Sequence, residues 1–209
     1  MDHHQWRDTG IWLIRHGEST WNADGLIQGH CDTPGLTAAG RAQAEELATS
    51  LPLSRIGSLY SSDLRRAVQT ARPLAAATGL PIRTDERLRE RALGPFEGLP
   101  TATLTPEVTG VFDGTVVDPD AAVPGMESLR DVLRRVSEFL AILGDEVGDG
   151  DIAVVTHGGA LRMLRAALND HPLAMLAWDD VPNAHVERLP LNSRCGTSAP
   201  VASPKEDAP

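Results

Sequence analysis

The sequence predicts an α/β protein with three layers, in which helices cover both faces of a mostly parallel central sheet. Three observations support this expectation. Short runs that are apolar at nearly every position alternate along the chain with longer segments of helical periodicity. Such runs are typical of strands buried on both faces, as parallel strands are. The 209 residues, 41% of them hydrophobic, are enough for one domain with a large core.

The expected strands are short and follow the apolar runs. The run GIWLIR leads directly into a His-Gly pair, and the later run DIAVVT does the same. Expected strands cover residues 10–15, 56–61, 82–84, 151–156 and 181–191. Two segments rich in Gly and Pro are predicted to be irregular: a loop over 17–36 and an insertion over 99–125.

Four helices are expected between and after these strands. They cover residues 38–51, 64–78, 126–143 and 158–168. Thr37 is a suitable N-cap for the first of them, with Ala42, Leu47 and Leu51 among its inward positions. The third has the strongest apolar stripe, formed by Leu129, Val132, Leu133, Val136, Leu140 and Leu143.

The second expected helix, over residues 64–78, has the clearest start and stop signals. Ser62 or Asp63 is expected to cap its start. Pro73 is expected to kink it or to mark a restart, because proline removes an N–H and clashes with the preceding turn. Gly79 is expected to end it.

Composition limits the partners and the compartment. With 29 acidic and 19 basic residues the formal net charge is −10, which argues against nucleic acid and anionic membranes as partners. Two cysteines form no disulfide framework, and no apolar run is as long as a signal-peptide core or a transmembrane helix. A cytoplasmic monomer or homodimer is therefore expected. Residues 1–191 are expected to form a single domain, and residues 192–209 a disordered tail.

Two histidines stand where ligands bind in parallel α/β folds, at the carboxyl ends of strands. His16 follows the first expected strand and His157 follows the fourth. Each is followed at once by a glycine, which lets backbone N–H groups come close to a ligand. Gly158 also opens a helix, and a helix N-terminus attracts anions.

Charged residues near the same edge indicate a pocket for a small dianion. Arg15 directly precedes His16, and Arg65 and Arg66 follow the second expected strand. The planar guanidinium group matches phosphate oxygens in charge and geometry. Glu90 follows the short third strand and is the candidate acid–base group.

Each of these features also has a structural explanation when it is taken alone. A histidine at the start of a loop is more often a satisfied structural group than a catalyst. One of the two adjacent arginines is expected to be a solvated residue at a helix start, and Glu90 alone would more often be a surface carboxylate. No Cys/His cluster has zinc-ligand spacing and no nucleotide-binding glycine motif is present, so neither a metal nor a cofactor is expected.

Six blocks of the sequence, in order, resemble the signature of the histidine phosphatase superfamily, in its phosphoglycerate-mutase-like branch. The first block is LIRHGESTWN at residues 13–22. The others are Gln28-Gly29 with Asp32 and LTAAG at 36–40, SSDLRRAVQTA at 61–71, LRE with GPFEG within 88–98, PGMESL at 124–129, and VVTHGG at 154–159. The resemblance runs from about residue 11 to 189 and implies one histidine-phosphatase-like catalytic domain.

The resemblance implies a role for each candidate residue. His16 would be the nucleophile that becomes a phosphohistidine. Arg15, Arg66 and His157 would bind the transferring phosphoryl group. Glu90 would protonate the leaving group and then activate water. The substrate side would be lined by Asn22, Gln28, Gly29 and Gly158.

The leading hypothesis is a metal-independent phosphomonoesterase, without a cofactor, that hydrolyses a small phosphorylated metabolite. The alternative is a phosphoglycerate mutase that uses 2,3-bisphosphoglycerate. The resemblance implies that mutases carry a basic insertion after the glutamate block, whereas residues 99–126 contain no Lys or Arg. This difference favours hydrolysis, because a mutase must retain a highly anionic intermediate.

Three further residues bear on this choice. Arg91, directly after Glu90, favours the mutase. Leu26 stands where many relatives have an arginine, and Met126 replaces a glycine of the fifth block, so the substrate contacts differ. A third hypothesis, a binding protein with an inactive site, is disfavoured because all five candidate catalytic residues are present.

Overall fold

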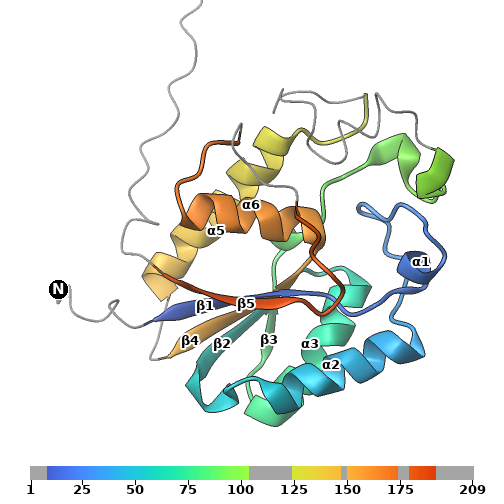
Figure 1. The fold of residues 1–209 in the computed structure, drawn as a ribbon. Helices are drawn as coiled ribbons and strands as arrows, with labels where there is room; N and C mark the ends of the chain where they lie inside the picture. Colours follow the sequence, from blue (N-terminus) through green and yellow to red (C-terminus); the bar gives the residue numbers. More distant parts are fainter. Residues whose placement is uncertain (1–8, 104–123, 147–149, 174–178, 192–209) are drawn as a thin grey trace, which may run out of the picture.

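The central sheet of the computed structural model has five strands in the order β3-β2-β4-β1-β5 (Figure 1). The structure describes residues 9–103, 124–146, 150–173 and 179–191. The strands are β1 (Gly10–Arg15), β2 (Ile56–Ser61), β3 (Ile82–Thr84), β4 (Asp151–Thr156) and β5 (Val186–Pro190). Strands β1 to β4 pair in parallel, and β5 runs antiparallel to β1 at one edge, so the sheet is mostly parallel, as predicted.

Helices cover both faces of this sheet and complete the predicted three layers (Figure 1). The helices on one face are α2 (Ala38–Ser50) and α3 (Arg65–Thr78), and those on the other are α5 (Leu129–Glu146) and α6 (Gly158–Leu168). Alternate residues of β4 serve the two faces, as the pleat of a strand requires. Ile152 and Val154 belong to the core beneath α5 and α6, whereas Ala153 and Val155 belong to the core beneath α2 and α3. Burial on both faces explains why this strand is continuously apolar.

The last strand is shorter than the predicted range 181–191. Residues 181–185 include a turn, in which the His185 N–H donates to the Pro182 carbonyl (3.0 Å) and Ala184 has a φ of 56°. Proline cannot donate to a strand ladder, and a left-handed residue reverses the chain direction locally. Regular pairing with β1 therefore begins only after this turn.

The first long helix confirms the predicted cap and corrects one predicted core residue. The Thr37 hydroxyl accepts the N–H of Gly40 (2.9 Å) at the start of α2. Ala44 and Leu47 are buried, but Ala42 is exposed. The prediction for Ala42 is wrong because a step of two residues turns a helix by about 200°, away from the buried face.

Helix α3 begins with a tertiary contact and not with a cap from its own sequence. Its N-cap residue is Leu64, which offers no side-chain hydrogen bond, so the predicted caps Ser62 and Asp63 are wrong. The first N–H of the helix, that of Arg65, is instead accepted by Asp32 from a distant loop. The carboxylate of Asp63 is engaged elsewhere, in an ion pair.

Other helix boundaries follow the predicted signals more closely. Helix α3 continues as one helix through Pro73, so the predicted restart is wrong, and Gly79 ends the helix with a φ of 73°, as predicted. Helix α5 begins at Leu129, slightly later than predicted. The Ser128 hydroxyl, which accepts the N–H of Asp131 (3.1 Å), marks this start.

The segment over 17–36, predicted as a loop, contains the short helix α1 (Thr20–Ala23). A capping box between Ser19 and Asn22 caps its N-terminus. Most of the predicted insertion, and all of the predicted tail, lie outside the described residues. The expected domain division therefore stays a prediction. None of the helices in the described part of the chain is long and apolar enough to cross a membrane.

Candidate active site

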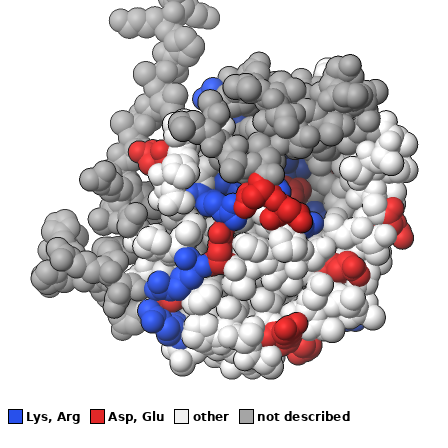
Figure 2. All heavy atoms as spheres, viewed as in Figure 1, with Lys and Arg blue, Asp and Glu red and all other residues white. Residues whose placement is uncertain are grey.

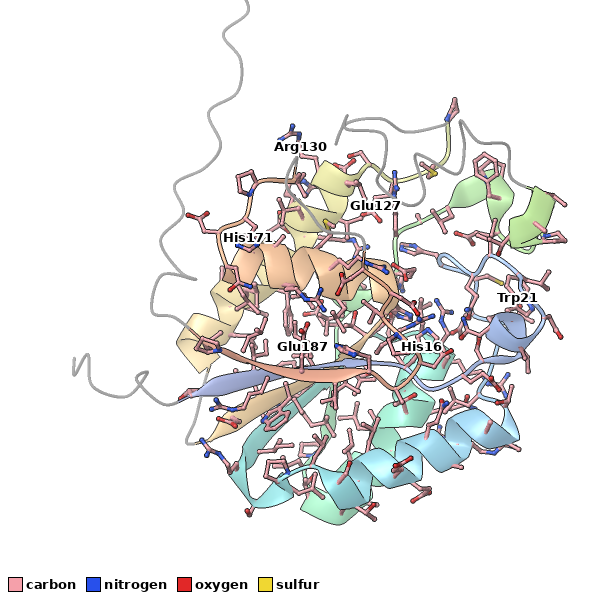
Figure 3. All side chains as sticks on the ribbon, viewed as in Figure 1. His16, Trp21, Glu127, Arg130, His171 and Glu187 are labelled. Atoms are coloured by element: carbon pink, nitrogen blue, oxygen red, sulfur yellow. The ribbon has the colours of Figure 1, made fainter. Side chains whose placement is uncertain are left out.

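The two strand-end histidines lie side by side at the carboxyl edge of the sheet (Figure 3 labels His16). Strands β1 and β4 are neighbours, and their register pairs Arg15 with Thr156, so His16 and His157 follow at the same level. The main-chain N–H of His16 donates to the Thr156 carbonyl (2.9 Å). The two imidazole rings are 5.1 Å apart between centroids, inclined at 62°, and both residues are buried. The parallel register thus brings the two histidines together.

The hydrogen bond of the His16 ring determines which nitrogen keeps a lone pair. Nδ1 lies 2.7 Å from the carbonyl oxygen of Gly17. A carbonyl can only accept, so Nδ1 carries the proton and Nε2 keeps its lone pair. Burial, followed by the positive charges of Arg66 and Arg15, holds the pKa of His16 well below its ordinary value of 6.5. The ring is neutral at pH 7 and can act as a nucleophile.

Arg66 is fully buried in the first turn of α3. It is held by main-chain carbonyls of the segment over 17–36, which follows β1. Its Nη1 donates to the Cys31 carbonyl (2.9 Å), and its Nη2 donates to the Gly29 carbonyl (2.8 Å). Burial lowers the pKa of Arg66 to about 10, so the guanidinium remains charged at pH 7. The neighbouring Arg65 is exposed, as expected of one member of the pair.

Three buried nitrogen atoms near the two histidines have no hydrogen-bond partner among the described residues. They are Nε of Arg15, Nε of Arg66 and Nδ1 of His157. The positive charges of Arg66 and Arg15 both help to lower the pKa of His16 and of His157, after burial, so these groups stand close together. A buried polar group without a partner costs about 1–3 kcal/mol. The two arginine N–H groups among these nitrogens are therefore suited to bind an oxyanion with several acceptor oxygens.

Glu90 is anchored beside the N-terminus of α6. Its carboxylate accepts the backbone N–H groups of Arg91 (2.8 Å), Gly159 (3.1 Å) and Ala160 (3.2 Å). A Cβ at Gly159 would overlap Oε1 of Glu90, so a side chain there would displace the carboxylate. The absence of a side chain at Gly159 thus lets Glu90 lie at the N-terminus of α6.

The main chain at Glu90 is held by Arg135 of α5, which the sequence analysis does not identify. The Arg135 guanidinium donates to the carbonyls of Arg87 (2.6 Å), Arg89 (2.7 Å) and Glu90 (2.9 Å). It also binds the carboxylate of Glu127 (2.7 Å), which is labelled in Figure 3. One side chain thereby fixes three main-chain carbonyls of the segment that carries Glu90. The sequence signal for this role is weak, because an arginine on a helix is usually a solvated residue.

Two of the residues predicted on the substrate side meet through Ser19. Its hydroxyl lies 3.0 Å from Oδ1 of Asn22 and 2.7 Å from Oε1 of Gln28. Asn183, which the sequence analysis missed, joins this group to the histidines. Its Nδ2 donates to Oδ1 of Asn22 (3.0 Å) and lies 3.3 Å from the His16 carbonyl. No periodicity or motif indicates this contact, because it depends on the turn before β5.

The other two predicted residues contribute backbone positions. Gly29, with a φ of 48°, offers its carbonyl to Arg66. A Cβ at Gly158 would lie 3.5 Å from Nη1 of Arg162 and 3.7 Å from Nε of Arg15, so both arginines stand beside this glycine. Arg162 is not among the predicted residues. It lies four positions after Gly158 on α6, and this helical spacing places the two on one face.

The chain belongs to the histidine phosphatase superfamily (branch 1), whose sequence model matches residues 11–199. This match confirms the resemblance drawn from the six sequence blocks. It also confirms, at the level of the family, the expectation of an enzyme of the histidine phosphatase type.

Two relatives with similar sequences carry phosphoglycerate mutase names. Phosphoglycerate mutase-like protein 4 of Arabidopsis thaliana is 42% identical over 160 residues, covering 74% of this chain and 68% of the relative. The probable phosphoglycerate mutase GpmB of Escherichia coli O1:K1 is 37% identical over 172 residues, covering 80% of this chain and 76% of the relative.

Solved structures with the same fold are similarly related. The mycobacterial glucosyl-3-phosphoglycerate phosphatase in complex with VO3 has a TM-score of 0.78 and 34% identity, and the match covers 86% of this chain and 92% of that one. YhfR of Bacillus stearothermophilus has a TM-score of 0.75 and 33% identity, covering 86% and 90% of the two chains.

Proposed function

We propose that the protein is a metal-independent phosphomonoesterase that hydrolyses a small phosphorylated metabolite through a phosphohistidine on His16. The observation that carries the proposal is a lone pair on Nε2 of His16 close to three buried nitrogen atoms without partners. Two of these atoms are N–H donors, Nε of Arg15 and Nε of Arg66, and the third is Nδ1 of His157. A phosphoryl group needs this combination of a nucleophile and donors for its equatorial oxygens.

The proposed reaction has two displacements at phosphorus. Nε2 of His16 attacks in line, so a P–N bond forms while the P–O bond to the leaving group breaks. The carboxyl group of Glu90 gives its proton to the leaving oxygen. Water then attacks the phosphohistidine and gives a proton to Glu90, which releases inorganic phosphate and restores the neutral imidazole. The guanidinium groups of Arg15 and Arg66 stabilise the charge on the equatorial oxygens in both steps.

Hydrolysis is favoured over mutase activity by the position of Arg91. This residue is the feature of the sequence that favoured the mutase. It is 5% exposed, and its Nε donates to the Glu127 carbonyl (2.6 Å), so it is engaged with the protein itself. The sequence from 99 to 126 contains no Lys or Arg that could bind the carboxylate of a phosphoglycerate in its place. The structural relative named as a glucosyl-3-phosphoglycerate phosphatase also supports hydrolysis.

The charge on the surface supports a small substrate over a large polyanion. Figure 2 shows acidic and basic side chains next to each other on one face of the molecule. Arg165, for example, pairs with both Asp179 and Glu187. The positive charge at the site comes from the buried Arg66 and the half-buried Arg15, which a small anion can reach more easily than a large one. The cytoplasmic location and the monomeric or homodimeric state stay predictions.

Replacement of His16 tests the nucleophile. His16→Ala is expected to lower phosphate release by more than about a hundredfold and to abolish labelling of the enzyme with a phosphoryl group that is stable to alkali and labile to acid. His171→Ala, at an exposed histidine labelled in Figure 3, serves as the control and should retain both properties. Retained turnover or labelling in His16→Ala would refute the proposal.

A coupled assay separates the alternatives. Interconversion of 3-phosphoglycerate and 2-phosphoglycerate, measured with and without 2,3-bisphosphoglycerate, should be slower than phosphate release from the best substrate of a phosphometabolite panel. Faster interconversion would establish the mutase instead. Stoichiometric trapping of a phosphorylated metabolite without turnover would establish a binding protein.

A further inference from the structure

Ser62 makes a direct contact with the second histidine of the site. It follows the last residue of β2, is 0% exposed, and its Oγ lies 2.9 Å from Nε2 of His157. Strands β2 and β4 are adjacent and parallel, so the residues after their carboxyl ends meet in space although they are far apart in sequence. The contact was not predicted, because the sequence assigned Ser62 a role as a helix cap.

The direction of this hydrogen bond follows from the needs of the buried hydroxyl. The Ser62 Oγ accepts the N–H of Leu64 (3.3 Å), which occupies one of its lone pairs. Its own O–H needs an acceptor, and within the described residues Nε2 of His157 is the acceptor that the structure provides. A buried O–H that donates to nothing costs about 1–3 kcal/mol. The O–H therefore donates to Nε2, and the ring proton of the neutral His157 lies on Nδ1.

The two histidines thus present opposite chemical properties to the site. In His16 the Gly17 carbonyl accepts from Nδ1, which leaves the Nε2 lone pair. In His157 the Ser62 hydroxyl occupies the Nε2 lone pair, which leaves an N–H at Nδ1. This Nδ1 is one of the three buried nitrogens without a partner. One ring is therefore a nucleophile and the other a hydrogen-bond donor, although both are neutral.

We propose that Ser62 is a positioning residue that selects the Nδ1–H tautomer of His157, so that this N–H donates to the phosphoryl oxygens in the transition state. The inference rests on the proposed function. The surroundings do not favour this tautomer by themselves. The positive charges of Arg66 and Arg15 lower the pKa of His157, after burial, so they favour the neutral ring without selecting a tautomer. The hydrogen bond with Ser62 makes that selection.

The backbone at Ser62 allows the hydroxyl to be removed without loss of the fold. Its main-chain N–H donates to the Val155 carbonyl (2.9 Å), and this bond does not involve the side chain. The adjacent Ser61 provides a matched control. It is equally buried, and its hydroxyl donates to the Ser62 carbonyl (2.8 Å) without touching either histidine.

The direct test is the tautomer of His157, measured by long-range ¹H–¹⁵N correlation spectra of the ligand-free protein, with the His157 signals assigned from their loss in His157→Gln. Wild type and Ser61→Ala are expected to carry the proton on Nδ1. Ser62→Ala should shift His157 toward the Nε2–H tautomer, and Ser62→Thr, which keeps the hydroxyl, should retain Nδ1–H. A wild-type His157 protonated on Nε2, or an unchanged tautomer in Ser62→Ala, would overturn the inference.

Kinetics on the best panel substrate provide the second readout. Ser62→Ala is expected to lower kcat about tenfold to a hundredfold with KM changed less than about threefold, because the lost donor acts on the transition state. Ser62→Thr should recover most of kcat, and Ser61→Ala should match wild type. Wild-type kcat in Ser62→Ala would refute the role of Ser62. The NMR result does not depend on turnover, so it stands apart from the fate of the proposed function, which His16→Ala decides.

Discussion

Asp151 joins the starts of β1 and β4 to the edge strand β5, at the end of the sheet opposite to the active site. It begins β4, whose other end leads to His157. Its carboxylate accepts the Gly10 N–H (2.8 Å), the Trp12 Nε1–H (2.9 Å) and two N–H groups of Arg188 (2.8 and 2.9 Å). Since these partners lie on or at the start of β1 and on β5, we expect the charge of Asp151 to stabilise the sheet that positions the histidines.

The size of this contribution follows from the pKa of Asp151. Burial alone would raise the pKa, but hydrogen bonds from Arg188, Gly10 and Trp12 outweigh it and lower the pKa from 3.8 to about 2. A difference of one in pKa is worth about 1.4 kcal/mol, so the ionised carboxylate contributes about 2 kcal/mol to the free energy of unfolding at pH 7. Because the folded-state pKa is the lower one, this contribution is complete well above pH 3.8 and is lost as the pH falls toward 2.

Asp151→Asn is therefore expected to lower the free energy of unfolding by about 2 kcal/mol at pH 7, measured by urea denaturation. The difference from wild type should shrink to about half by pH 3. Glu138→Gln is the control, because its ion pair with Arg134 (3.3 Å) is exposed and should contribute less than about 0.5 kcal/mol. A loss below about 0.5 kcal/mol in Asp151→Asn, or a loss that is the same at pH 7 and pH 3, would refute the reasoning.

Three further predictions concern the site. Burial, Arg66 and Arg15 hold the pKa of His16 well below 6.5, so kcat/KM should not fall as the pH is lowered from about 7.5 to about 6. A decline centred near pH 6.5 would show that the nucleophile titrates in the ordinary range. Arg66→Lys should lower kcat/KM about a hundredfold, since a single ammonium cannot reproduce the planar fork in which Nη1 and Nη2 bind two loop carbonyls while Nε stays available to a phosphoryl oxygen. The exposed Arg65→Lys should match wild type. Activity should survive EDTA, because the arginines supply the positive charge and no group of three potential metal ligands occurs in the described residues. Loss of activity in EDTA, with recovery of activity on addition of Mg²⁺ or Zn²⁺, would contradict this prediction.

Local pattern was enough to predict the fold class and the position of the two histidines. The apolar run of β4 indicated a strand buried on both faces, and parallel strands bring their carboxyl ends to one edge. Thr37 and Gly79 marked helix ends correctly, because a cap is a contact between residues close in sequence. Hydrophobic periodicity and capping are local properties, and they can be seen in the sequence directly.

Contacts between segments that are distant in sequence were decided only by the tertiary structure. Asp32 caps α3, Arg135 holds the loop of Glu90, and Ser62 bonds to His157. In each case the donor and the acceptor meet because of strand register and helix packing, and a hydroxyl or guanidinium in the sequence carries no sign of which partner it will reach. The sequence by itself thus determined which strand ends would carry the two histidines. The tertiary structure decided which nitrogen of His157 holds the proton, because that depends on the Ser62 hydroxyl, which the packing of β2 beside β4 places 2.9 Å from Nε2.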